Sequence, residues 1–359
     1  MEKIRFLDEQ GTFSLAQPEN YSNLYFPVAN ELGLKGALTP NFGGDCKLDQ
    51  NTFLLEPVSV ENLHNNRGVR NFWVGTENAF WSAVGASAAQ EAQRFTPAQE
   101  DSTLTAGFMW QRVRRSSAAL GLTAEVLCFV PPERRLEVFS VTLENTGSAP
   151  LRISPTAAIP IYGRSADNLR DHRHVTSLLH RIETTEHGVL VKPTLSFDER
   201  GHRKNDVTYF VCGIEGDGAC PVGYYPTVED FIGQGGTLTH PRALLQGQPP
   251  VPAGRRLAGK EALGGIAFAE RTLSPGERVR YTVLLGATTE PEEIRQSLEA
   301  FATEKQVLAA LRATQQFWDA RVNVRYCTGD GRFDQYLRWI SFQPFLRRIY
   351  GCSFLPHHD

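Results

Sequence analysis

The chain has 359 residues, 41 % of them hydrophobic and 21 % charged, which is the balance of an ordinary globular protein rather than a disordered one. Its formal net charge of -3 and its pI of about 6.3 give no electrostatic basis for binding nucleic acid or an anionic membrane. The sequence contains no run of about 18 apolar residues, the length needed to cross a membrane. Its charged N-terminus lacks the apolar segment of a secretion signal. The sequence therefore predicts a cytoplasmic protein.

Residues 1 to about 285 carry the pattern of strands and turns. From Leu122 to Val130 every second residue is apolar or small, and Pro131 and Pro132 end the run. Comparable alternating segments recur at 139–143, 151–153, 207–211 and 279–285. Many short strands at spacings of about ten residues favour an antiparallel β-sandwich over a parallel α/β sheet. The segments 163–174, 197–206 and 223–258 are expected to be long surface loops on this sandwich.

The hydrophobic period changes to a helical one at Thr289. Thr289 to Glu292 has the form of a capping box, with Thr289 as the N-cap and Glu292 at the third helical position. Apolar residues then recur at intervals of three, four and seven: Ile294, Leu298, Phe301, Leu308, Leu311, Trp318 and Val322. This stripe predicts one amphipathic helix, or two with a break near Thr303, packed against the sandwich.

A further helix is expected after Gly331. Its predicted apolar side consists of Phe333, Leu337, Ile340 and Ile349. Pro344 should kink this helix or mark its true start, because proline lacks the backbone donor and clashes with the preceding turn. The same segment carries Trp339, Phe342, Phe345 and Tyr350. One helix cannot bury all these aromatic faces alone, so we expect further helices as its partners.

Cysteine and histidine spacing gives little support to a metal centre. The six cysteines lie far apart and form no CxxC pair: Cys46, Cys128, Cys212, Cys220, Cys327 and Cys352. We expect reduced thiols rather than a zinc site or a disulfide framework. His172 and His174 would share a face on a strand, but the sequence places no third ligand beside them. We therefore expect no metal and no cofactor.

Two segments carry candidate sugar-binding groups. Residues 51–74 are rich in Asn, His, Arg and Trp, including His64, Asn71 and Trp73. Amides can bond pairs of sugar hydroxyls and an aromatic face can stack on a pyranose, although the same groups can equally fix a loop network. In the tail, Arg347 and the run His357, His358 and Asp359 could bind a polar or anionic ligand, or could simply be a helix end followed by an exposed terminus.

Several of these motifs together resemble glycoside hydrolase family 94, formerly glycosyltransferase family 36. The matching segments are 11–15, 25–31, 50–64, 70–74 and, in the tail, 348–354. The family consists of inverting disaccharide and oligosaccharide phosphorylases, and the match is closest to the 1,2-β-oligoglucan phosphorylase type and looser to cellobiose phosphorylase. The resemblance covers nearly the whole chain, and its middle part, about 160–260, is only generally similar.

The resemblance implies a galactose-mutarotase-like β-sandwich, a helical linker, an (α/α)6 catalytic barrel and a small C-terminal β domain. We accordingly expect the sandwich over residues 1–287, the linker over 288–328 and the start of a truncated barrel over 329–359. In the family, the general-acid Asp and most of the donor-sugar site follow the segment that ends at Asp359. The chain is then the front part of a longer enzyme, and Asp359 is not that acid.

The chemistry implied is glycosyl transfer between a β-gluco-oligosaccharide and inorganic phosphate, which releases glucose 1-phosphate. A phosphorylase needs one carboxylic acid and a phosphate site, because phosphate replaces the base-activated water of an inverting glycosidase. Without the general acid we expect no phosphorolysis by this chain alone. Two alternatives stay open: a stand-alone carbohydrate-binding or partner-docking module, and a mutarotase-like epimerase, which would need a His and a carboxylate across a concave face. Expected partners are the oligosaccharide, the missing barrel in cis or as a separate chain, and a second copy in a homodimer.

Overall fold

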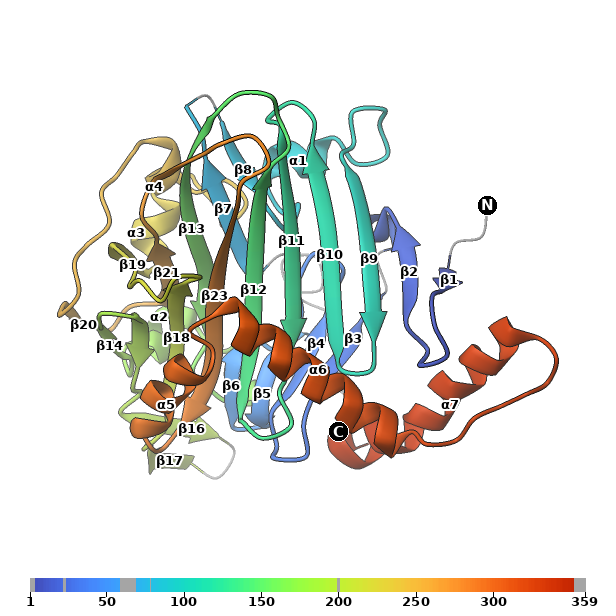
Figure 1. The fold of residues 1–359 in the computed structure, drawn as a ribbon. Helices are drawn as coiled ribbons and strands as arrows, with labels where there is room; N and C mark the ends of the chain where they lie inside the picture. Colours follow the sequence, from blue (N-terminus) through green and yellow to red (C-terminus); the bar gives the residue numbers. More distant parts are fainter. Residues whose placement is uncertain (1–3, 22–23, 59–68, 78, 199–200, 352–359) are drawn as a thin grey trace.

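The computed structural model describes residues 4–21, 24–58, 69–77, 79–198 and 201–351 (Figure 1). It confirms the predicted fold class, a mainly β protein built from large antiparallel sheets with some helices packed against them. The largest sheet has 11 strands in the spatial order β1 (Ile4–Phe6), β2 (Phe13–Ala16), β9 (Asp101–Gly107), β10 (Trp110–Ser117), β11 (Leu122–Phe129), β12 (Leu136–Asn145), β23 (Arg278–Thr288), β18 (Thr208–Glu215), β15 (Gly188–Val191), β14 (Arg181–Thr184) and β20 (Arg256–Ala258).

Smaller sheets face and flank the large one. The second sheet is ordered β19 (Gly223–Thr227), β21 (Ala262–Ala267), β13 (Leu151–Ile161), β7 (Asn71–Gly75) and β8 (Phe80–Ser82), with β22 (Arg271–Leu273) paired to β13. A third contains β3 (Phe26–Ala29), β4 (Lys35–Leu38), β5 (Cys46–Asp49) and β6 (Thr52–Leu55), and a hairpin joins β16 (Leu195–Asp198) to β17 (Gly201–Lys204). The main core lies between the large sheet and these smaller sheets.

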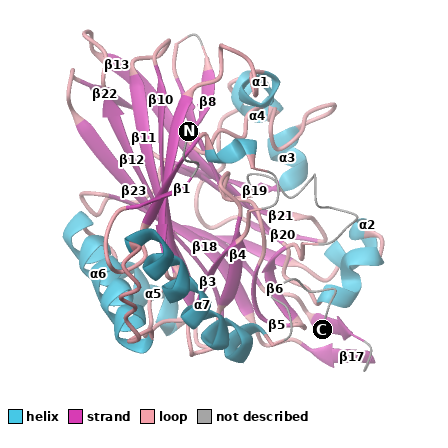
Figure 2. Ribbon diagram, turned by 90° about the vertical axis from the view of Figure 1, so that its right-hand side faces the viewer, coloured by secondary structure: helices cyan, strands magenta, loops and turns pink. Residues whose placement is uncertain are grey.

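The central strands of the large sheet are buried on both faces. In β11 the alternating residues found in the sequence, such as Leu122 and Val126, belong to the core between the sheets. The intervening Leu127 and Phe129 belong to a second core on the opposite face, which is covered by helices α5 (Glu292–Ala300) and α6 (Glu304–Arg321). Figure 2 shows α5, α6 and α7 (Gly331–Tyr350) on one side of the large sheet and the short helices α1 (Ala88–Ala92), α3 (Val228–Ile232) and α4 (Arg242–Leu245) on the other.

The predicted helical break is confirmed, but the predicted capping box is in the wrong place. Helix α5 ends at Ala300 and α6 begins at Glu304, with Thr303 and Gln306 forming a reciprocal capping box. Helix α5 begins at Glu292 with Pro291 as its N-cap. Strand β23 continues to Thr288, whose hydroxyl accepts the Glu290 N–H at 2.9 Å. Thr289 is therefore not available as the start of a helix.

Helix α7 (Gly331–Tyr350) runs unbroken through Pro344, and its buried side differs from the predicted one. Phe333 and Ile340 are exposed. The buried positions are Asp334, Arg338, Phe342, Leu346, Ile349 and Tyr350. Phe342 packs on Phe108 of the sandwich with ring centroids 4.5 Å apart, and the Trp339 indole N–H donates to the Gly11 carbonyl at 2.8 Å. This aromatic contact attaches α7 to the N-terminal strands.

The three predicted long loops contain short elements. Segment 163–174 includes a 3-10 turn at Ala166–Arg170 and the start of α2 (Arg173–Ser177). Another 3-10 turn, Pro18–Asn20, lies between β2 and β3. Segment 197–206 belongs largely to the β16–β17 hairpin, and 223–258 contains β19, α3, α4 and β20. Among the described residues no helix is long and apolar enough to cross a membrane.

Candidate functional site

The structure places two of the predicted sugar-binding residues inside the sandwich. Asn71 and Trp73 lie on β7 and are 3 % and 2 % exposed. Asn71 accepts a hydrogen bond from the Ser82 hydroxyl at 2.7 Å, and Trp73 packs with Tyr225 and Phe231 in a core cluster beneath α3. Both side chains therefore help to pack the sandwich in this conformation.

The remaining predicted site residues lie at the end of the chain or outside the described part. Arg347 is exposed in the last turn of α7, while His64, His357, His358 and Asp359 fall outside the described residues. His172 and His174 do not lie on a strand as considered, because His172 caps α2 and His174 is inside it. No group of three or more His, Cys, Asp or Glu within the described ranges could hold a metal ion.

A groove on the sandwich, beside α2 and α3, has a volume of about 690 Å³. Residues far apart in sequence form its walls, among them His174, Leu178, Glu229, Lys260 and Glu261. Strand pairing brings them together: Tyr225 of β19 lies opposite Gly265 of β21, and just beyond that pair the Val228 N–H donates to the Glu261 carbonyl at 2.9 Å.

The charged groups of this groove are already paired with protein atoms. Lys260 Nζ lies 2.6 Å from Glu229, and the Arg164 guanidinium lies 2.6 Å from Glu261. The hydrogen bond from Lys260 lowers the pKa of Glu229. Asp230, also in the groove wall, accepts the Thr227 hydroxyl at 2.7 Å as part of the α3 cap. These carboxylates have little free capacity to bind a ligand.

The groove does bring a histidine close to a carboxylate, which an epimerase would need. His174 and Glu229 both line it, and the charge of His174 contributes to the lowered pKa of Glu229. Glu229 is nonetheless exposed and neutralised by Lys260, so it is a weak proton donor at neutral pH. The sequence could not reveal this pair, since 55 residues separate its members and only tertiary pairing joins them.

One histidine and one carboxylic acid have pKa values far from their usual range, and both are enclosed. Burial, reinforced by the nearby Arg164, lowers the pKa of His180 to about 3. Burial raises the pKa of Asp45 to about 6, against the opposing charges of Lys47 and Arg70. Among the described carboxyl groups with a shifted pKa, Asp45 is the one whose pKa is raised. At 1 % exposure, Asp45 cannot reach a substrate.

Comparison with known families decides the classification. The supersandwich domain of glycosyl hydrolase 94 matches residues 49–304, well over half of the chain. The chain belongs to glycoside hydrolase family 94. No curated protein sequence matches this family 94 chain.

Solved structures with a similar arrangement are distant in sequence. A bacterial glucoamylase complexed with acarbose is 7 % identical, with a TM-score of 0.50 over 88 % of this chain and 40 % of that one. A protein from the human microbiome that is assigned as a kojibiose phosphorylase is 9 % identical, with a TM-score of 0.46 over 96 % of this chain and 42 % of that one. The family 94 chain thus spans less than half the length of either protein, and the first likeness supports a shared fold.

Proposed function

We propose that this chain forms the N-terminal segment of an inverting β-glucoside phosphorylase. The full enzyme transfers a glucosyl unit from a β-gluco-oligosaccharide to inorganic phosphate and releases glucose 1-phosphate, with the 1,2-β-oligoglucan type as the closest member of the family. The observation that carries the proposal is the match of residues 49–304 to the family 94 supersandwich domain. Phosphate is a co-substrate here, and the proposed chemistry needs no cofactor.

We place the general acid of this enzyme in the catalytic barrel. A phosphorylase must protonate the leaving sugar oxygen, and that step needs an accessible carboxylic acid with a raised pKa. In the described part of the chain Asp45 has a raised pKa but is enclosed, and the carboxylates of the groove are paired with cations or a cap. The sandwich therefore supports a catalytic barrel rather than replacing it.

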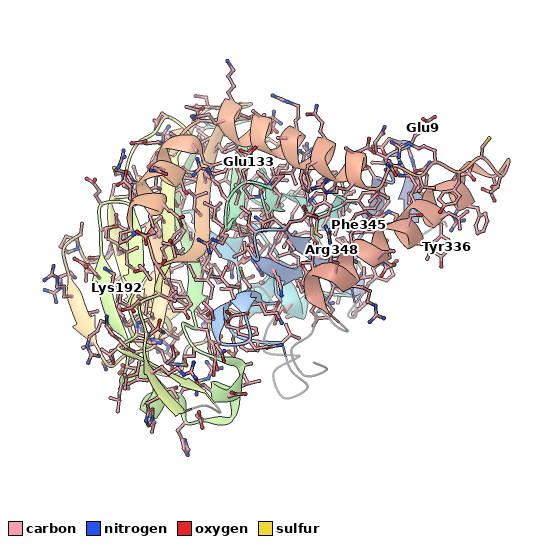
Figure 3. All side chains as sticks on the ribbon, turned by 90° about the horizontal axis from the view of Figure 1, so that it is seen from below. Glu9, Glu133, Lys192, Tyr336, Phe345 and Arg348 are labelled. Carbon is pink, nitrogen blue, oxygen red and sulfur yellow. The ribbon has the colours of Figure 1, made fainter. Side chains whose placement is uncertain are left out.

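The outer face of α7 is the surface on which we place the barrel, supplied in cis or as a separate chain. Phe333, Tyr336 and Ile340 recur at helical spacing and are 46 %, 54 % and 47 % exposed. Phe345, by contrast, contacts Trp318 of α6, and Figure 3 shows it on the helix nearer the sandwich than Tyr336. Residues 329–359 then begin the barrel, residues 288–328 form the linker, and Arg347, His357, His358 and Asp359 approach the sugar.

Two measurements test this proposal. The purified chain, incubated with phosphate and β-1,2-gluco-oligosaccharides, should release no glucose 1-phosphate, because it lacks the general acid. The α7 surface is tested by Tyr336→Asp, which should weaken assembly with the catalytic barrel at least tenfold while leaving thermal stability unchanged. Val222→Asp, at a residue 62 % exposed on the sandwich, is the matched control. Phosphorolysis by the isolated chain, or equal assembly of both variants, would overturn the proposal.

A further inference from the structure

A second cavity lies where the sandwich meets the helices. The β1–β2 turn, the β9–β10 turn and the C-terminal half of α6 enclose a volume of about 330 Å³. Its walls include Asp8, Gln10, Gln315, Gln316 and Asp319, with Phe108 and Trp110 beneath them. We call this cavity the junction pocket. Figure 3 labels Glu9, the residue between Asp8 and Gln10, at the end of the molecule where α6 and α7 meet.

Internal hydrogen bonds fix the walls of the junction pocket. Asp8 accepts the backbone N–H groups of Gln10 and Thr12, each at 2.9 Å, which closes the β1–β2 turn. Asp319 accepts from Arg338 at 2.8 Å and from Arg325 at 3.0 Å. These two contacts neutralise and orient the Asp319 carboxylate. These bonds fix the frame of the pocket, so the ordering cost of binding falls on its glutamine side chains.

Three amide side chains in this pocket are free to bind a ligand. Gln10, Gln315 and Gln316 form no side-chain hydrogen bond with any part of the chain that the structure describes. Each amide offers a carbonyl acceptor and two N–H donors, which can bond two neighbouring hydroxyl groups at once. This distinguishes the pocket from the groove beside α3, whose carboxylates are engaged with Lys260, Arg164 and Thr227.

The base of the pocket offers a small apolar contact. Phe108 and Trp110 are each 5 % exposed, so they present a small, rigid aromatic area at its base. Phe108 is held against Phe342 of α7, and the Arg112 guanidinium lies over the Trp110 ring. Ligand sites typically combine such apolar surface with a few placed polar groups. At 330 Å³ the pocket lies at the small end of the usual range of roughly 300–1,000 Å³.

The charge of the pocket selects against anions. Its charged lining residues are Asp8 and Asp319, and no Lys or Arg lines it. The arginines beside the pocket, Arg325 and Arg338, are already paired with Asp319, so a sugar phosphate would find no free cation there, whereas uncharged hydroxyl groups need none. We propose that the junction pocket binds one ring of a neutral saccharide, with Gln10, Gln315 and Gln316 bonding its hydroxyl groups. Binding at this pocket does not require the proposed phosphorolysis.

Titration calorimetry and ligand-observed NMR on the full chain test the proposal, with sophorose and methyl β-glucoside as neutral probes and glucose 1-phosphate as the charged one. We expect sophorose to bind with a Kd of about 1 mM and glucose 1-phosphate at least tenfold more weakly. The double variant Gln315→Ala/Gln316→Ala should weaken sophorose binding at least tenfold. Alanine favours a helix, so α6 should remain folded.

The matched control is Gln296→Ala, an exposed glutamine on α5 outside the pocket, which should leave sophorose affinity unchanged. Three results would each overturn the assignment. The first is no binding of either neutral probe at a concentration about ten times the expected Kd. The second is equal affinity of the double variant and the wild type for sophorose, and the third is tighter binding of glucose 1-phosphate than of sophorose. Because the readout is binding, failure here is distinguishable from failure of the phosphorylase proposal, which is measured by product release.

Discussion

The buried ion pair between Arg70 and Glu137 gives the sharpest test of how the sandwich is stabilised. Both side chains are 0 % exposed. Arg70 donates to both carboxylate oxygens of Glu137, and also to the backbone carbonyls of Phe42, Gly43 and Asp45 at 3.3, 3.1 and 2.8 Å. Gly44, at φ +99°, allows this turn, since a Cβ there would lie 1.8 Å from the Ala37 carbonyl oxygen. The three carbonyls hold the guanidinium in place whatever happens to Glu137.

Glu137→Gln preserves the shape of the side chain and removes its charge, so the Arg70 charge stays buried without its paired carboxylate. Breaking one partner of a buried pair costs about 3–5 kcal/mol. Glu144→Gln on the same strand is the control, because its partner Arg278 is 62 % exposed, and such a surface pair contributes at most about 1 kcal/mol. Urea denaturation followed by tryptophan fluorescence gives both free energies of unfolding. Equal losses in the two variants would show that the buried pair contributes no more than the surface pair.

Two further predictions concern pH. The raised pKa of Asp45, about 6 in the fold against 3.8 when unperturbed, means that the folded state binds more protons than the unfolded state between these values. The contribution of Asp45 to stability is therefore present at low pH and is lost as pH rises from 3.8 to 6. Asp45→Asn should remove this pH dependence of the free energy of unfolding, measured by urea denaturation at several pH values. An unchanged pH dependence in the variant would contradict the prediction. The pKa of His180 is lowered from 6.5 to about 3, so its stabilising effect is present above pH 6.5 and is lost as pH falls toward 3. His180→Gln should make the chain less sensitive to acid, and equal acid midpoints for variant and wild type would argue against a buried neutral imidazole.

Much of the sandwich could be predicted because local patterns follow burial there. The alternation from Leu122 to Val130 marks the face of β11 in the inter-sheet core, and the turn residues between runs separate β11, β12 and β13. The break near Thr303 was visible for the same reason, since a helical stripe was interrupted by a capping residue. In each case neighbouring residues suffice to set the structure.

Helix α7 shows where such patterns fail. Counting apolar residues selected Phe333 and Ile340, yet Asp334 and Arg338 are the residues that turn toward the protein. Asp334 accepts the Thr328 N–H and hydroxyl at 2.9 and 2.7 Å, and Arg338 pairs with Asp319 of α6. Partners outside the helix bind these polar groups, whereas hydropathy alone assigns the two residues to solvent.

The candidate sites depend on tertiary pairing in the same way. Trp73 suggested a sugar-stacking surface, but it lies on an internal strand of the second sheet and is covered by the segment that contains Phe231. The amides of the junction pocket come from Gln10 and from Gln315 and Gln316, which are about 300 residues apart in the sequence. No spacing rule connects them, because the contact exists only once α6 has packed across the large sheet (Figure 1).

The most direct test of the account is the product formed when the chain is expressed together with a family 94 catalytic barrel, in one reading frame or two. With phosphate and a β-gluco-oligosaccharide, ³¹P NMR should detect α-glucose 1-phosphate, the inverted product, and none in either part alone. Formation of the β anomer, release of free glucose without phosphate incorporation, or full activity of the barrel in the absence of this chain would contradict the account.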